Sequence, residues 1–123
     1  PNETEVTALT TIQVAGAGQA RMAADALIGR GVGSVIVTLG ENGALIHGNG
    51  ISAHVSAFNA GPVVETTGAG DAFNAAFAVG LAEGMTPQNA VRFGCATAAI
   101  SVTRAGAAAS MPLRAEVDAL LHR

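Results

Sequence analysis

The residues with the clearest chemical potential are Gly68-Ala69-Gly70-Asp71, which follow an extended segment at residues 62–65 and open an apolar helix. Glycines let the backbone approach a ligand closely. Free N–H groups of Ala69, Gly70 and Asp71 at the helix start would form an anion site, which the positive end of the helix dipole strengthens. The Asp71 carboxylate beside it is a candidate general base. Such a pairing suits phosphoryl transfer to an alcohol.

The same tetrapeptide also has a purely structural interpretation, in which Asp71 caps the helix after a glycine-rich turn, and four residues alone favour it. Familiar phosphate motifs do not decide the question. The chain contains no Lys and therefore no Walker P-loop, and Gly16-Ala17-Gly18-Gln19-Ala20-Arg21 lacks the third glycine of the dinucleotide pattern.

The N-terminal segments that would support this chemistry alternate between helix and strand. Asn2 and Glu5 have the spacing of a capping box at the start of a helix over residues 2–9. A second helix is expected at residues 19–30. The β-branched run at 34–39 predicts a strand buried on both faces, as in a parallel sheet. Residues 44–47 and 51–55 flank Gly48-Asn49-Gly50 and predict a β-hairpin.

The C-terminal segments are mostly helical. A helix is expected at residues 71–83, and a second from Thr86, as the cap, and Pro87, at the first helical position, to about residue 104. Both are rich in small apolar residues, which predicts burial on more than one side. A loop at 106–112 precedes a final amphipathic helix at 113–122.

Together with its flanking residues, the tetrapeptide forms a recognisable motif. Val64-Glu65-Thr66-Thr67-Gly68-Ala69-Gly70-Asp71 resembles the D-T-x-G-A-G-D signature of the ribokinase-like, or pfkB, carbohydrate kinases. Three further segments resemble motifs of that family in the same order: Asn2-Glu3-Thr4-Glu5 (N-x-x-E), residues 37–44 (T-x-G-x-x-G) and the tail at 102–112. The resemblance covers essentially the whole chain, and four ordered motifs argue against chance.

The resemblance implies a fold as well as an activity. The expected fold is α/β: part of a ribokinase-like three-layer sandwich, with a mostly parallel sheet flanked by helices and one β-hairpin. Residues 1–123 would form a single C-terminal nucleotide-binding and catalytic portion, with the sugar-binding half and its lid absent. The implied reaction is ATP-dependent phosphorylation of a pentose, D-ribose above all, to the 5-phosphate.

The implied site residues follow from the matching positions. Asp71 would be the base that meets the sugar substrate, and Gly68, Ala69 and Gly70 would build the anion hole. The residues implied for ATP are Asn2, Thr38, Gly40, Gly43, Gly70 and Cys95, and Glu5 would organise Mg²⁺ through water. The oxygen ligands implied for K⁺ belong to Glu65, Thr67, Ser101, Arg104, Gly106 and Ser110.

Each of these assignments has a structural alternative. Asn2 and Glu5 could simply form a capping box, and Thr38 and Gly40 a strand end with a tight turn. The family usually has Asp where Glu65 stands, and the added methylene puts the cation geometry in question. Cys95 would line the adenine pocket or serve as a small buried hydrophobe, the role that its chemistry favours. The three His residues lack metal-ligand spacing and are expected at the surface.

Composition limits the remaining function classes. The net charge is −3 and no basic stripe is present, which argues against nucleic-acid binding. The single Cys excludes an internal disulfide, no signal peptide is recognisable, and no apolar run is long enough for a membrane span, so a cytoplasmic protein is expected. The start at Pro1, without Met, suggests a piece of a longer protein.

Three functional hypotheses stay open from the sequence. The first is the ribose kinase described above. The second is an isolated, non-catalytic α/β half that folds and associates without phosphorylating anything, since no sugar pocket is encoded here. The third is a kinase of the same family acting on another sugar or a nucleoside. An exposed apolar edge is expected, covered by a homodimer partner or by the absent N-terminal half.

Overall fold

The computed structural model describes all residues from 1 to 123. The chain divides into two compact units, Pro1–Ser56 and Ala57–Arg123. Each unit has a hydrophobic core of its own.

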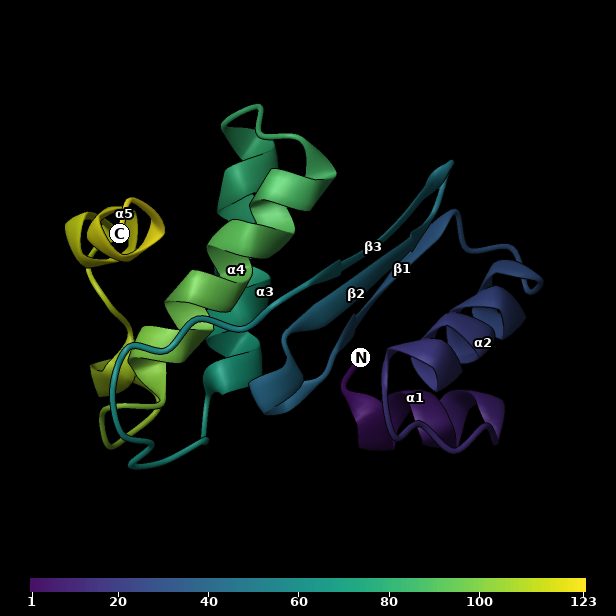
Figure 1. Cartoon of the computed structure of the whole chain (residues 1–123), viewed down its shortest axis with the longest axis horizontal. Helices are drawn as coiled ribbons and strands as arrows, with labels where there is room; N and C mark the ends of the chain where they lie inside the picture. The colour runs from purple at the N-terminus through teal and green to yellow at the C-terminus, as the bar shows by residue number, and fades with distance from the viewer. The chain divides into compact units, whose positions relative to one another are not determined.

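The first unit is an α/β layer of two helices and a small sheet. It contains α1 (Glu3–Thr10), α2 (Ala17–Ile28), β1 (Ser34–Thr38), a short 3-10 turn at Gly40–Asn42, β2 (Ala44–Gly48) and β3 (Ile51–Val55). The strands follow the order β1-β2-β3. Both helices lie on the same face of this sheet (Figure 1).

The core of this unit forms where α2 meets the sheet. Val35 and Val37 alternate with less buried residues along β1, and Leu45 of β2 lies beside Val37 on the same face. Three alanines of α2 are fully buried against them, so the helix backbone can approach the strands closely. The buried members of this cluster are Val6, Ala20, Ala23, Ala24, Val35, Val37, Leu39 and Leu45.

The expectation of a mostly parallel sheet is wrong for the strands of this chain. Both strand pairs are antiparallel, and the one parallel contact is an isolated bridge between Asn2 and Thr38. The reason is the length of the connections. Residues 39–43 and the turn at Asn49-Gly50 are too short for a crossover, which needs about a dozen residues. The expected burial of this strand on both faces is also wrong. Val35 and Val37 are buried on one face of β1, whereas the other face is exposed at Ser34 and half-buried beyond it.

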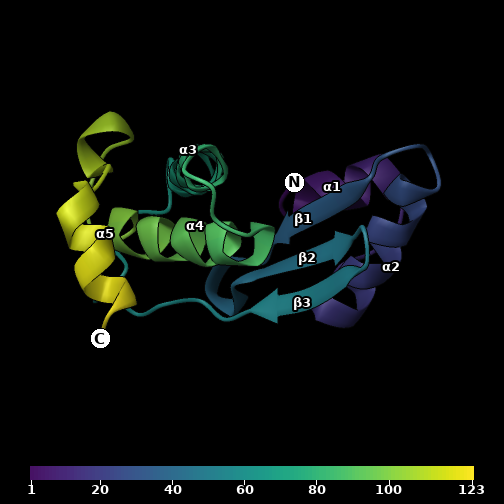
Figure 2. The same ribbon diagram turned by 90° about the horizontal axis from the view of Figure 1, so that it is seen from above.

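The β-hairpin is confirmed, with its register centred on the expected turn. Gly48 pairs with Ile51, and Ala44 with Val55. The turn residues Asn49 and Gly50 have φ angles of 52° and 81°, the left-handed pair that closes a two-residue hairpin. Figure 2 shows the two strands running in opposite directions.

The second unit is helical. It consists of α3 (Ala69–Ala82), α4 (Pro87–Ser101), a 3-10 turn at Ala108–Ser110 and α5 (Arg114–Leu121). Helices α3 and α4 approach closely through glycines: a Cβ on Gly94 would lie 2.8 Å from the Phe73 ring, and one on Gly80 would lie 3.2 Å from the Cα of Ala90. The core of this unit gathers Ala76, Phe93, Ala96, Ile100, Val117 and Leu120.

The expected helix boundaries largely hold. The Thr86 hydroxyl accepts a hydrogen bond from the Asn89 amide, and Pro87 opens α4, as expected. This helix ends at Ser101, a few residues before the expected position. Burial on more than one side is correct for α4, of which nine residues are buried, but wrong for α3, where Val79 and Leu81 are exposed. No helix in the chain combines the length and apolar character that a membrane span requires.

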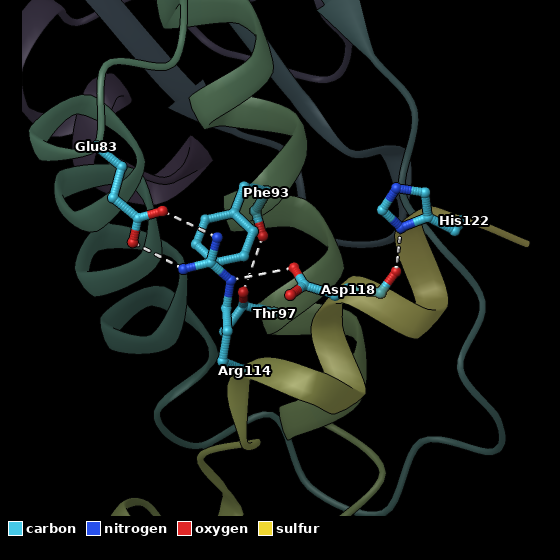
Figure 3. A network of polar contacts seen from close by, with 6 residues as sticks. All are labelled: Glu83, Phe93, Thr97, Arg114, Asp118 and His122. Carbon is cyan, nitrogen blue, oxygen red and sulfur yellow. Dashed lines mark hydrogen bonds and ion pairs between the residues drawn. The ribbon is translucent and has the colours of Figure 1, made fainter.

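Helix α5 is fastened by a cluster of charged side chains that Figure 3 shows from close by. The Arg114 guanidinium donates two hydrogen bonds to the Glu83 carboxylate at the end of α3, at 2.7 and 2.9 Å. Its Nε donates to Asp118, one turn further along α5, at 3.0 Å. The pairing with Asp118 has helical spacing, whereas Glu83 is 31 residues away and becomes a neighbour only through the fold.

Candidate active site

The N-terminus of α3 carries backbone donors that the chain leaves unused. Gly68 is the N-cap residue, with a φ of 81° and no capping side chain. The Ala69 amide donates to the Thr66 carbonyl at 3.2 Å, and the Ala72 amide donates to Gly68 at 2.9 Å. Between them, the amides of Gly70 and Asp71 have no partner within the chain. The expected set of three free amides is thus reduced to two.

Asp71 does not act as the cap. It is the third residue of α3, in the first turn, and its side chain makes no hydrogen bond within the chain. It is exposed to solvent. Since the cap position belongs to Gly68, the structural interpretation of Asp71 as a capping residue is wrong. A free carboxylate stands beside two free amides instead.

The space around Gly70 is open. A Cβ built on this residue would meet no heavy atom within 4 Å, and its φ is not in the left-handed region. The fold therefore does not require glycine here. Open space beside unpartnered amides at the positive end of a 14-residue helix is what an anion such as a phosphoryl group needs.

The residues expected around a cation come from one part of the second unit, the loop at residues 104–110 and the segment before α3. The Glu65 carboxylate accepts a hydrogen bond from the Gly106 amide at 3.0 Å. This bond, and secondly one from the Thr67 side chain, lowers the pKa of Glu65 below its ordinary value of 4.5. The Cα of Ala107 lies 3.2 Å from where a Cβ on Gly68 would be, so the loop lies against the α3 N-terminus.

The other expected cation ligands have local partners. The Ser110 hydroxyl donates to the Ala107 carbonyl at 2.7 Å, and the Ser101 hydroxyl donates to Ala98 at 2.8 Å. The Arg104 side chain pairs with Glu116 of α5, while its amide donates to the Ser101 carbonyl at 3.2 Å. The hydroxyl oxygens keep free lone pairs, so the oxygen donor set of this loop suits a hard monovalent cation. One oxygen of the Glu65 carboxylate already accepts from the Gly106 amide.

Asn2 and Glu5 form the capping box that their spacing indicates. The Glu5 amide donates to Asn2 Oδ1 at 2.8 Å, and the Asn2 amide donates to Glu5 Oε2 at 2.9 Å. No cluster of three or more His, Cys, Asp or Glu side chains is present to hold a metal directly. The second carboxylate oxygen of Glu5 is left free, so this pair suits a hydrated Mg²⁺ held through water.

Besides Asn2, the expected nucleotide residues of the first unit lie at the end of β1 and in the tight turn after it. The Thr38 amide donates to the Pro1 carbonyl at 3.0 Å. Gly40 and Gly43 have positive φ angles of 57° and 86°, and a Cβ on Gly40 would meet nothing within 4 Å. This turn closes through a bond from the Leu39 amide to the Gly43 carbonyl at 2.8 Å.

Cys95 is a buried, free thiol within α4. It is 7% exposed, and burial raises its pKa to about 11. Its side chain therefore behaves as a small hydrophobe in this structure, while its expected contact with adenine stays a prediction. Of the three His residues, His54 and His122 are exposed and His47 is half-buried.

Two polar arrangements had no signal in the sequence. Glu116 both pairs with Arg104 and accepts from the Leu113 amide at 2.7 Å; only the second contact has a helix-cap spacing. In the first unit, the His47 ring lies 2.7 Å from Asp25 Oδ1 and 2.9 Å from Ser52 Oγ. This cluster joins α2 to the hairpin across long stretches of sequence.

Comparison with known proteins gives this geometry a family. Residues 1–114 match the model of the pfkB family carbohydrate kinases. A ribokinase of Haemophilus influenzae is 41% identical over 116 residues, which cover 94% of this chain and 38% of that protein. A deoxyribokinase of Salmonella typhi is 39% identical over 112 residues, 91% of this chain and 36% of that protein.

Solved structures agree in fold. A ribokinase of Arabidopsis thaliana, complexed with ribose and ATP, matches all of this chain and 40% of its own at a TM-score of 0.94 and 40% identity. A phosphofructokinase-2 of Escherichia coli, in complex with potassium, matches 99% of this chain and 39% of its own at 0.85 and 26%. The expected α/β, ribokinase-like fold is confirmed for this portion. The chain spans well under half the length of these relatives, and it belongs to the pfkB family of carbohydrate kinases.

Proposed function

We propose that this chain is the ATP-side catalytic portion of a sugar kinase, which transfers the γ-phosphoryl group of ATP to a pentose hydroxyl. D-Ribose is the acceptor that the ribokinase relatives favour, with D-ribose 5-phosphate and ADP as products. One observation carries the proposal: at the start of α3, the unpartnered amides of Gly70 and Asp71 stand beside an exposed carboxylate that does not serve as a cap.

The roles of these groups follow from the chemistry. The Asp71 carboxylate takes the proton of the acceptor hydroxyl while its oxygen forms the new bond to phosphorus and the β–γ bridge of ATP breaks. The amides of Gly70 and Asp71 donate to the oxygens of the group in transfer, aided by the helix dipole. Gly68 and Ala69 form the turn that aims these donors.

ATP would be held by Asn2, Thr38, Gly40, Gly43 and Gly70, with Cys95 near its adenine ring. Glu5 would hold the water shell of Mg²⁺, which would neutralise charge on the phosphates. A monovalent cation, K⁺ in the proposal, would take oxygens from Thr67, Ser101, Arg104, Gly106 and Ser110, with Glu65 nearby. Residues 1–123 would then act as one C-terminal catalytic portion that needs a sugar-binding part, supplied by an N-terminal half or another chain.

Two alternatives stand beside this proposal. The similarity to a deoxyribokinase favours a kinase that acts on another sugar, and a nucleoside is the remaining acceptor class. The other alternative is a non-catalytic half that folds without turnover. An ADP-release assay on the 123-residue chain with ribose separates these cases, because ribose-dependent ADP release refutes the non-catalytic alternative.

The decisive experiment joins this chain to the N-terminal part of the H. influenzae ribokinase, replacing the portion that it matches. We expect ATP- and ribose-dependent turnover from the chimera, and a loss of several orders of magnitude in kcat for Asp71→Asn, which keeps the shape but removes the base. Asp25→Asn, an exposed change in α2, serves as the matched control. Near-normal turnover of Asp71→Asn in a folded chimera would refute the assignment.

A further inference from the structure

The loop at residues 104–110 rests on the turn that begins α3. Ala107 approaches Gly68 so closely that a Cβ there would lie 3.2 Å from the Ala107 Cα and 3.4 Å from its Cβ. Gly68 in turn holds the left-handed conformation that orients the first amides of α3. A shift of this loop would therefore displace Gly68, and with it the free amides of Gly70 and Asp71.

Two carboxylates contact this loop, one from a residue before it in the sequence and one from a residue after it. Glu65, before α3, accepts from the Gly106 amide at 3.0 Å. Glu116, in α5, pairs with Arg104 at the start of the loop. Glu65 is the one that connects the loop to the segment leading into the anion site.

The length of the Glu65 side chain matters for this contact. Its backbone is fixed, because the amides of Val64 and Glu65 both donate to the Val102 carbonyl, at 2.7 and 3.2 Å. A side chain one methylene shorter would draw the carboxylate back by about 1.5 Å, to roughly 4.5 Å from the Gly106 amide, which is beyond hydrogen-bonding range. The added methylene of Glu is thus what reaches Gly106.

We infer that Glu65 is a positioning residue, whose hydrogen bond to the Gly106 amide holds Ala107 over Gly68 and so keeps the Gly70 and Asp71 amides aimed at a phosphoryl group. This inference rests on the proposed function for the choice of ligand. It does not rest on a bound cation. The contact is made by the protein alone, between a carboxylate and a backbone amide.

Two substitutions distinguish this role from that of a cation ligand. Glu65→Gln keeps the length and an oxygen acceptor but loses the charge. Glu65→Asp keeps the charge but loses the reach. A positioning role requires the Gln variant to retain the hydrogen bond to the Gly106 amide, here called the tether, and the Asp variant to lose it. A residue that acts by binding a cation requires the reverse order, because the carboxylate charge is then the essential property.

The test uses nuclear magnetic resonance on the 123-residue chain and its variants, with inorganic phosphate as the probe. We expect the Gly106 amide to exchange with solvent about tenfold faster in Glu65→Asp than in wild type, since a hydrogen bond to a charged group is lost. In Glu65→Gln it should change by about threefold or less. Phosphate affinity, followed at the Gly70 and Asp71 amides, should fall several-fold in the Asp variant and stay near wild type in the Gln variant.

Several outcomes would overturn the inference. Unchanged Gly106 exchange in Glu65→Asp shows that the tether is not made, and faster exchange with unchanged phosphate affinity shows that it does not position the amides. A Gln variant that binds phosphate more weakly than the Asp variant would show that the charge of Glu65, and not its length, is the essential property. Asp25→Asn, an exposed change in α2 of the first unit, is the matched control, and it should change neither readout. Failure of the proposed function is seen separately, as a chimera that lacks turnover while the tether and phosphate binding persist.

Discussion

The Arg114 guanidinium lies over the face of the Phe93 ring, 4.7 Å from its centroid, while its nitrogens pair with Glu83 and Asp118. One side chain of α5 thus contacts an aromatic ring of α4 and a carboxylate at the end of α3 (Figure 3). A planar guanidinium can stack and form paired hydrogen bonds at once, whereas an ammonium cannot. The contact determines how α5 is attached to the second unit.

The first prediction concerns this attachment. Arg114→Lys should lower the melting temperature by a few degrees, because Lys keeps the charge but loses the bidentate pair and the stacking. Arg123→Lys, a change at the C-terminal residue, is the control. Thermal unfolding followed by circular dichroism measures the difference. Equal melting temperatures for both variants would show that the stacked, paired geometry contributes nothing.

The second prediction concerns pH and the same ion pair. The hydrogen bond from Arg114 lowers the pKa of Glu83 in the folded chain. The unfolded carboxyl therefore binds a proton more readily, and the contribution to stability is present above its ordinary pKa of about 4.3 and is lost as pH falls through the lower, folded pKa. Glu83→Gln should be less stable than wild type at pH 7 and approach it below pH 4. Denaturant unfolding across this range provides the test, and a stability difference that stays constant with pH contradicts it.

The third prediction compares two glycines at the α3 N-terminus. Gly70→Ala should leave the unfolding free energy unchanged or raise it by up to about 1 kcal/mol, because its Cβ meets nothing and Ala favours a helix. It should nevertheless weaken phosphate binding, because the methyl group enters the open space beside the amides.

Gly68→Ala is the matched structural variant. Its positive φ and the nearby Ala107 should cost about 1–2 kcal/mol of stability. Chemical unfolding combined with phosphate titration separates the two effects. If the Gly70→Ala chain binds phosphate as tightly as wild type, the anion does not bind beside Gly70.

The fourth prediction concerns Cys95. With a pKa of about 11 instead of 9.0, its thiolate fraction at pH 8 is about a hundredfold lower than that of an ordinary thiol, and burial limits access further. Iodoacetamide should label the folded chain at least a hundredfold more slowly than the chain in denaturant. Mass spectrometry follows the modification. Rapid labelling of a chain that stays folded would place the thiol at an accessible surface.

Local patterns in the sequence were sufficient for most elements. Asn2 with Glu5, Thr86 with Pro87, and Gly48-Asn49-Gly50 each specify a cap or turn through contacts between near neighbours, and the structure contains all three. The ordered motifs around Thr38, Asp71 and Gly106 likewise indicated the family, because each is a short run of neighbouring residues that can be recognised without knowing the fold.

Other features depended on contacts that no local pattern encodes. The β-branched run of β1 is compatible with either strand direction, and the short connections selected the antiparallel one. The tetrapeptide alone favoured Asp71 as a cap, and the structure gave that position to Gly68. Glu65 with Gly106, Arg104 with Glu116 and Glu83 with Arg114 join residues 12 to 41 positions apart. The sequence by itself determined which residues can do chemistry, since residue type and local backbone suffice for that. Only the structure decided which amides stay free, because that depends on where α3 begins and which amides its first turn uses. The carboxylate that holds the loop above them was likewise decided by the tertiary structure, because it follows from packing between segments that are distant along the chain.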